Sequence, residues 1–240
     1  ADVTLATSYT DAENFRKKGA NAFCITNGFD VDASTTLSMT EENSKTLPLS
    51  NSTTKFTLSY IGVLEQLRNP EILWETLNDL VQENADFKND FQLKFVGRLD
   101  DKILQKIESS ALKNNLTNLG YQTHDVALKH MQDSSVLLIT NFPQESSKGI
   151  IPGKIFEYLA TGKTILSFGP KDADVEKILN ETKAGKHFGY NEKENLKNFI
   201  LESYQNWKSG TLNQNAENIE QFSRKNLTQK LVDLMNENLF

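Results

Sequence analysis

The sequence predicts an α/β fold in which a doubly wound, Rossmann-like parallel sheet carries helices on both of its faces. From Phe56 onward, short apolar segments with strand character alternate with longer amphipathic segments of helical period. Strands and helices that alternate in this way form βαβ units, and such units build a parallel sheet. The segments 136–139 (VLLI) and 164–168 (TILSF) are largely apolar, which is typical of strands that helices cover on both sides.

The first thirty residues predict a smaller strand–helix–strand unit. Residues 2–7 and 22–26 have the alternation of strands. Residues 10–18 predict a helix with Thr10 as its N-cap. Residues 31–55 are rich in Ser, Thr and Asn and have no sustained period, so we expect a linker there.

The alternation after this linker predicts six strands with a helix after each of them. We expect strands at 56–62, 91–97, 116–121, 135–140, 163–169 and 185–190. We expect helices at 70–84, 101–113, 125–132, 153–160, 173–181 and 192–208. Asn69 is the predicted N-cap of the first of these helices, with Pro70 in its first turn. Two helical segments between Leu212 and Leu239 end the sequence.

Composition and charge narrow the class of protein. The chain has 240 residues and a net charge of −6, which argues against a surface that binds nucleic acid. No apolar run approaches the roughly 20 residues that cross a bilayer. Cys24 is the only cysteine, which fits a reducing cytoplasm. Because the sequence begins directly in a strand pattern without an initiator Met, we expect that an N-terminal portion is missing.

Ligands of doubly wound sheets bind beyond the carboxyl ends of the strands, so the segments that follow the strands are the candidate site. These segments are 62–68, 97–98, 120–124, 141–152 and 169–171. The loop before the helix at 153–160 offers free backbone N–H groups and a helix N-terminus, which predicts an anion site. Lys154 and Glu157 share one face of that helix, where they could hold phosphate and sugar hydroxyls or form an ordinary solvated ion pair.

The sequence does not support two other ligand-binding motifs, the Walker A phosphate-binding loop and the Asp-x-Asp metal site. The segment 157–164 (EYLATGKT) ends like a Walker A loop, but it has Glu157 where that loop begins with Gly, and it leads from a helix into a strand. Gly162 is better explained as the left-handed residue that ends a helix. The Asp-x-Asp pairs at 30–32 and 172–174 are typical of turns and lack further ligands at suitable spacing, so we expect no metal site.

Several segments, taken in order, resemble the nucleotide-sugar-binding domain of GT-B-fold glycosyltransferases of the group 1 class. The segment 152–166 (PGKIFEYLATGKTIL) resembles the signature of that domain. Residues 58–77 resemble its first strand–loop–helix, and residues 118–140 (NLGYQTHDVALKHMQDSSVLLIT) resemble its base-binding turn with the following helix and strand. The segment 25–30 (ITNGFD) resembles the exit from the N-terminal domain, and residues 222–239 resemble the terminal helix that crosses back to it.

The resemblance implies a domain organisation and an activity. Residues 1–30 would be the last strand–helix–strand of an N-terminal acceptor domain, with a linker at 31–55. Residues 56–211 would bind the donor, and helices at 212–240 would cross back. The implied reaction moves a sugar from a nucleoside-diphosphate sugar to an acceptor, as in cell-surface polysaccharide or glycolipid synthesis. The implied location is the cytoplasm, with peripheral contact to the inner membrane face through the missing domain.

The resemblance also assigns roles to individual residues. Glu157 would accept hydrogen bonds from the ribose, and the loop around Tyr121 would hold the base. Arg68 and Lys154 would act in catalysis by stabilising the charge of the departing diphosphate, in place of a metal cofactor. The remaining expected donor-binding residues are Gly62, Arg98, His124, Ser147, Lys148, Gly149, Ile150, Ile151 and Gly153, with the backbone N–H groups of residues 149–151 facing the diphosphate or sugar.

The sequence departs from the family pattern in places, and other functions stay open. The first Glu of the family's Glu-x7-Glu is replaced by Gly149, so the donor sugar and the stereochemical outcome are not specified. Val63 stands where many relatives have Arg, and Arg68 is one position from the usual Lys. The alternatives are a non-catalytic nucleotide- or protein-binding module and a GT-B nucleotide-sugar 2-epimerase. We expect these 240 residues to bind the donor without transferring its sugar.

Overall fold

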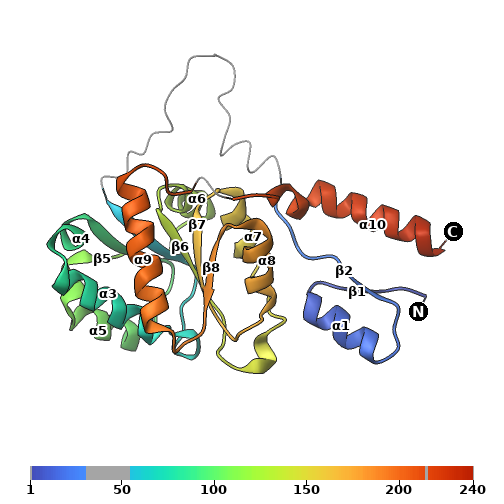
Figure 1. Cartoon of the computed structure of the whole chain (residues 1–240), viewed down its shortest axis with the longest axis horizontal. Helices are drawn as coiled ribbons and strands as arrows, with labels where there is room; N and C mark the ends of the chain where they lie inside the picture. The colour runs from blue at the N-terminus through green and yellow to red at the C-terminus, as the bar shows by residue number, and fades with distance from the viewer. Residues whose placement is uncertain (1, 31–54, 214–215, 240) are drawn as a thin grey trace, which may run out of the picture.

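The computed structural model describes residues 2–30, 55–213 and 216–239 (Figure 1). The predicted linker, 31–55, lies outside the described residues except for Lys55. None of the helices within the described ranges is both long and apolar enough to cross a lipid bilayer.

A six-stranded parallel sheet forms the centre of the molecule. Its strands are β3 (Phe56–Ile61), β4 (Phe91–Val96), β5 (Leu116–Asn118), β6 (Val136–Thr140), β7 (Thr164–Phe168) and β8 (Gly185–Phe188). The order β5-β4-β3-β6-β7-β8 means that the chain builds one half outward from β3, returns to the centre and builds the other half outward from β6. At the centre, Leu58 pairs with Leu93 on one side and with Val136 on the other. This arrangement confirms the predicted doubly wound sheet.

Two apolar cores lie on the two faces of this sheet. Tyr60 and Leu138 belong to one core, while their neighbours Ile61 and Ile139 belong to the other, because successive strand residues face opposite sides. The first core is covered by α3 (Glu71–Glu83), α5 (Asp101–Glu108) and α9 (Lys193–Lys208). The second is covered by α6 (His124–Gln132), α7 (Lys154–Ala160) and α8 (Asp174–Thr182). The apolar character of the central strands on both faces is therefore explained by helices on both sides.

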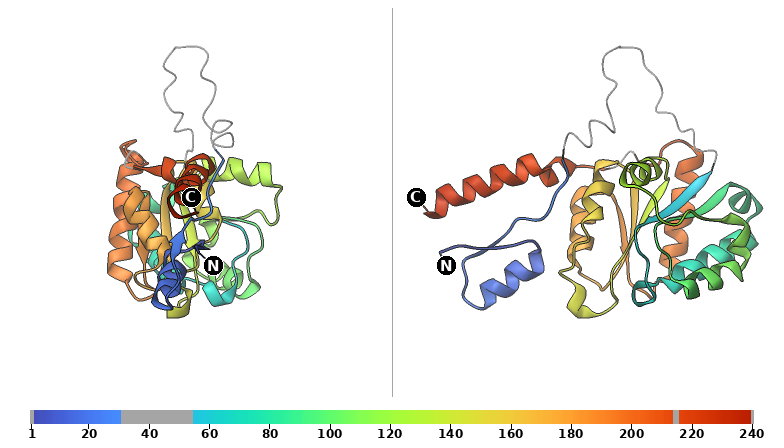
Figure 2. Two further views of the ribbon diagram at one scale, coloured as in Figure 1. Left: turned by 90° about the vertical axis from the view of Figure 1, so that its right-hand side faces the viewer. Right: turned by 180° about the vertical axis from the view of Figure 1, so that it is seen from behind.

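The N-terminal unit and the last helix lie beside the sheet domain. Strands β1 (Thr4–Ala6) and β2 (Ala22–Cys24) pair in parallel around α1 (Tyr9–Lys17). Helix α10 (Arg224–Leu239) extends from the same side of the sheet domain as this unit, as both views show (Figures 1 and 2). A parallel bridge joins Phe29 to Ser223 directly before α10.

Some predicted element ends are wrong by a few residues. Ser8, not Thr10, caps α1, because its Oγ accepts the N–H of Asp11 at 3.1 Å. Helix α3 begins at Glu71, and the predicted cap Asn69 instead accepts the indole N–H of Trp74 at 2.7 Å. The predicted helix 101–113 is interrupted after Glu108 and continues as a 3₁₀ segment.

The structure contains one helix that the sequence does not predict, and it confirms one predicted helix end. A short helix, α4 (Ala85–Asp90), forms where the sequence predicts none, with Asn84 as its N-cap. Gly162 has φ +66°, so the left-handed residue expected after α7 is confirmed.

Candidate functional site

The topological switch point lies between β3 and β6, the two central strands from which the chain winds in opposite directions. The loop after β3, residues 62–70, and the loop after β6, residues 141–153, leave the same edge of the sheet. In Figure 1 that edge is the lower one, where the chain enters α7. Several residues predicted from the sequence meet here.

Lys154, the first residue of α7, reaches back across the switch point to β3. Its ammonium donates to the carbonyl of Ile61 at 2.7 Å and lies 4.3 Å from the centre of the Tyr60 ring. Burial, together with the positive charge of Arg68, lowers the pKa of Lys154 to about 8, while Glu157 opposes the change. Within the described residues Lys154 and Glu157 form no ion pair, so the alternative of a solvated Lys–Glu pair is not found.

Arg68 is the second cation at the switch point. Its Nη2 donates to the carbonyl of Val63 at 3.1 Å and to the carboxylate of Glu65 at 3.2 Å, and its guanidinium lies 5.6 Å from the centre of the Phe142 ring. The side chain is 22% exposed. Its Nε is buried and has no acceptor within the described part of the chain. A buried donor without an acceptor is costly, so this edge of Arg68 is suited to an oxygen ligand.

Tyr60 lies between the two cations in the network of contacts, although no motif in the sequence marks it as a site residue. Its ring lies beneath the Lys154 ammonium, and its hydroxyl donates at 2.8 Å to the Val63 carbonyl that Arg68 also uses. Burial raises the pKa of Tyr60, which keeps its hydroxyl a hydrogen-bond donor. Tyr60 therefore contacts Lys154 directly and shares a hydrogen-bond acceptor with Arg68.

Gly62 and Gly97 end β3 and β4 with φ of +120° and +119°. A Cβ on Gly62 would lie 2.9 Å from the Lys154 ammonium, and one on Gly97 would lie 2.2 Å from the carbonyl oxygen of Gly62. Gly62 is therefore required by its backbone conformation, and Gly97 is required both by its conformation and by its contact with the backbone of Gly62.

Replacing Gly62 with alanine is expected to lower the melting temperature by roughly 2 to 10 °C, because a side chain at this φ is strained and would displace the Lys154 ammonium. Gly153→Ala is the matched control, since a Cβ there meets nothing within 4 Å and the φ is −53°. Thermal unfolding followed by circular dichroism measures both. Equal melting temperatures for the two variants would contradict this account of Gly62.

The loop after β6 uses many of the polar groups that the sequence predicts for a ligand. The buried hydroxyl of Ser147 lies 2.6 Å from the carbonyl of Phe142, and the ammonium of Lys148 pairs with Glu145 at 2.7 Å. The N–H of Ile150 donates to the carbonyl of Ser147 at 2.9 Å, so it is not available as predicted. Among the loop residues predicted to bind the donor, the backbone N–H groups of Gly149, Ile151 and Gly153 have no acceptor within the described residues.

Gly149 makes its close contact with the N-terminal unit. A Cβ at this position would lie 3.0 Å from Ser8 Oγ and 3.2 Å from Thr10 Cβ. The same end of α1 is held by the buried carboxylate of Asp174, which accepts the hydroxyl of Thr10 at 2.7 Å and its N–H at 3.1 Å. The absence of a side chain at Gly149 therefore lets the N-terminal end of α1 pack against this loop, and Asp174 has a structural role.

The other predicted residues lie nearer to solvent. Arg98 follows β4 with an exposed side chain, Tyr121 is 87% exposed, and His124 is the exposed first residue of α6. Glu157 is half-buried on α7, one turn after Lys154. These positions lie along the carboxyl edge, and within the described residues only one of them, Glu157, acts on either cation, through its charge near Lys154.

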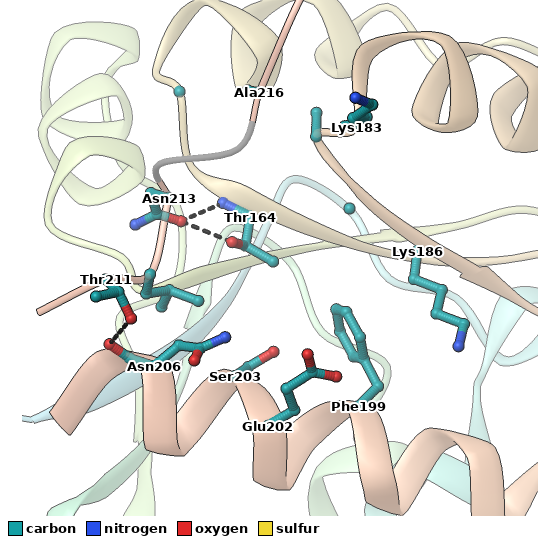
Figure 3. A pocket seen from close by; sticks show the side chains of 14 residues that line it. Thr164, Lys183, Lys186, Phe199, Glu202, Ser203, Asn206, Thr211, Asn213 and Ala216 are labelled. Carbon is teal, nitrogen blue, oxygen red and sulfur yellow. Dashed lines mark hydrogen bonds between the residues drawn. The ribbon is translucent and has the colours of Figure 1, made fainter. Parts of the chain in front are cut away.

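A separate cavity of about 260 Å³ lies at the opposite edge of the sheet, where β7 and β8 begin. Figure 3 shows Glu202, Ser203 and Asn206 of α9 facing this cavity, with Thr164 and Lys186 on the strands above. None of the residues predicted for the site lines it. The predicted site and this cavity are therefore distinct.

The comparisons with known proteins rest on structure, not on sequence. No protein-family profile matches the chain, and no curated protein sequence matches it. A TarM variant from S. aureus, in complex with fondaparinux, α-GlcNAc-glycerol and UDP, has a TM-score of 0.68 at 17% identity over 98% of this chain. HepE of Anabaena in complex with UDP-glucose has a TM-score of 0.68 at 18% identity over 99%. The pneumococcal O-GlcNAc transferase GtfA, in complex with UDP and GlcNAc, has a TM-score of 0.64 at 12% identity over the whole chain.

These likenesses establish the fold. The chain has the GT-B glycosyltransferase fold, and its six-stranded parallel sheet with helices on both faces matches the Rossmann-like half of that fold. The chain spans 44% of the TarM structure, 64% of HepE and 46% of GtfA. The resemblance noted in the sequence is thereby confirmed at the level of the fold.

Proposed function

We propose that this chain is the donor-binding half of a glycosyltransferase that moves a sugar from a nucleoside-diphosphate sugar to an acceptor. The observation that carries the proposal is the pair of cations at the switch point, Lys154 and Arg68, held around Tyr60. The unpaired Nε of Arg68 adds a donor that a phosphate oxygen would satisfy. Solved proteins of this fold that carry UDP or UDP-glucose are consistent with such a ligand.

In this proposal the diphosphate lies between Arg68 and Lys154. When the sugar leaves, negative charge develops on the diphosphate, and the two fixed cations stabilise it without a divalent metal. The free backbone N–H groups of Gly149, Ile151 and Gly153 would add further donors. Glu157 would accept hydrogen bonds from the ribose, while the loop around Tyr121 and His124 would hold the base.

The acceptor would be bound by a second domain. In GT-B enzymes the donor and acceptor sites face each other from two halves, and catalysis needs both. The N-terminal unit, residues 1–30, would belong to that second domain. These 240 residues alone would then bind the donor without transferring its sugar. Synthesis of cell-surface polysaccharide or glycolipid at the cytoplasmic membrane face belongs to this proposal as well.

A calorimetric titration of the purified chain with UDP, GDP and ADP tests the proposal. We expect saturable binding with preference for one nucleotide, and no release of sugar from the matching nucleotide sugar. Failure of all three to bind at millimolar concentration would contradict donor binding by this chain. Binding that is unchanged in Glu157→Ala would instead favour a non-catalytic nucleotide-binding module.

The affinity for the nucleotide is expected to fall as the pH rises above about 8. In the free chain Lys154 loses its proton near this pH, whereas a bound diphosphate favours the protonated ammonium. Above pH 8, binding requires that Lys154 take up a proton, so the affinity drops by roughly tenfold per pH unit. Below pH 8 Lys154 is already protonated and contributes no pH dependence to the affinity. Titrations between pH 7 and 9.5 measure this slope.

Lys154→Arg is the control for the pH profile, because a guanidinium stays protonated over the whole range. Its profile is expected to be flat. An equal slope in this variant and in the wild type would assign the pH dependence to another group.

A further inference from the structure

Asn141, the first residue after β6, is buried and forms hydrogen bonds with three segments at the carboxyl edge: β7, the loop after β6 and the segment after β8. Its backbone N–H continues the sheet by donating to the carbonyl of Phe168 at 2.8 Å. Its side-chain Nδ2 donates to the carbonyl of Ile150 at 2.8 Å, across the loop that follows β6. Its own carbonyl accepts the hydroxyl of Tyr190. Asn141 is only 2% exposed, so the Asn141 ends of these bonds are shielded from water.

Tyr190 connects Asn141 to the edge strand β8. It follows β8, and its ring packs 5.7 Å from the ring of Phe168. Burial raises the pKa of Tyr190, so its hydroxyl stays protonated and donates to Asn141, while the charge of nearby Arg68 opposes this rise. Tyr190 therefore lies within electrostatic reach of the proposed diphosphate site.

The bond from Asn141 to Ile150 fixes the direction of the next amide. A peptide group is planar and trans, so its C=O and N–H point in opposite directions. Because the carbonyl of Ile150 is held by Asn141 Nδ2, the N–H of Ile151 is held pointing away from Asn141. This N–H is one of those that have no acceptor within the described part of the loop.

We infer that Asn141 and Tyr190 are positioning residues for the diphosphate: together they fix the loop after β6 so that the Ile151 amide is preset to donate to a phosphate oxygen. This inference rests on the proposed function, and it adds to that function a chain of contacts from β8 to the ligand. The benefit is preorganisation, since a loop already held in its bound conformation loses less entropy on binding. Neither residue touches the ligand in this scheme.

Tyr190→Phe tests the inference, because it removes the hydroxyl and keeps the ring. The ligands are the nucleoside diphosphate that the wild type prefers among UDP, GDP and ADP, and its parent nucleoside. We expect the diphosphate to bind about five- to tenfold more weakly, the usual effect of one lost hydrogen bond, and the nucleoside to bind equally well. In the absence of ligand, backbone amides of residues 141–151 are expected to exchange hydrogen faster.

Tyr204→Phe is the matched control. Tyr204 is also buried and donates its hydroxyl to Asp90 at 2.6 Å, but it lies on α9, and Asp90 directly precedes β4 at the edge of the sheet opposite the switch point. This control is expected to leave both affinities unchanged. Asn141→Ala, which removes the contact to Ile150 itself, is expected to weaken diphosphate binding at least as much as Tyr190→Phe.

The possible outcomes separate the inference from the function on which it rests. Equal diphosphate affinity in Tyr190→Phe and in the wild type overturns the positioning role and leaves the proposed function intact. Equal weakening of diphosphate and nucleoside also overturns it, because the residue would then only stabilise the fold. A wild type that binds no diphosphate overturns the proposed function, and the positioning role with it.

Discussion

Arg68→Ala is expected to lower the affinity for the preferred nucleoside diphosphate by about 100-fold, the usual cost of removing one member of a buried, hydrogen-bonded charge pair. Arg68 is mostly buried beside Phe142, and its Nε has no acceptor within the described residues. Its attraction to a phosphate is therefore weakly screened by water. Isothermal titration calorimetry measures the loss.

Two other arginines serve as comparisons for this variant. Arg98 lies on the same edge of the sheet but is exposed, so Arg98→Ala is expected to change the affinity less than fivefold. Arg224 pairs with Asp30 at 3.1 Å near α10, and Arg224→Ala should have no effect on binding. If Arg68→Ala binds as tightly as the wild type while remaining folded, the diphosphate does not lie at the switch point.

Glu157→Ala is expected to weaken binding of the nucleoside diphosphate by roughly 10- to 100-fold, because hydrogen bonds to a charged group are the stronger ones. The loss should be specific for the ribose. Inorganic pyrophosphate has no ribose, so its affinity should stay the same or rise when the negative charge near Lys154 is removed.

Glu145→Ala is the matched control for Glu157. It removes a carboxylate from the neighbouring loop, where Glu145 pairs with Lys148 on the surface. We expect no loss of nucleotide affinity in this variant. Equal losses of nucleotide and pyrophosphate affinity in Glu157→Ala would contradict a contact to the ribose.

Most of the fold could be predicted because its signals are local. The strands 136–140 and 164–168 are apolar on both faces, and the left-handed Gly162 ends a helix of regular period. Helix capping is also a local signal, but Ser8 and Thr10 are both residue types that can cap the start of α1. Ser8 caps α1, whereas Thr10 lies inside its first turn and donates to Asp174, a contact across 164 residues that no sequence pattern reveals.

The candidate site was only partly predictable. Lys154 could be selected from its place at the start of a helix, but its bond to Ile61 and its position over Tyr60 depend on a distant strand. The Ile150 N–H was expected to face a ligand but donates to Ser147, and Gly149 lies against Ser8 and Thr10 of the N-terminal unit. Asn141 and Tyr190 carry no motif at all. Their importance follows from the order of the strands, which brings their loops together.

A crystal structure of this chain with the nucleoside diphosphate that it prefers tests the central claim most directly. The account predicts the diphosphate at the switch point, in contact with Arg68 and Lys154, with the ribose hydroxyls on Glu157. Under this account the Ile151 amide also donates to a phosphate oxygen. A nucleotide bound elsewhere, such as in the cavity between β8 and α9, with the switch point empty, would contradict it.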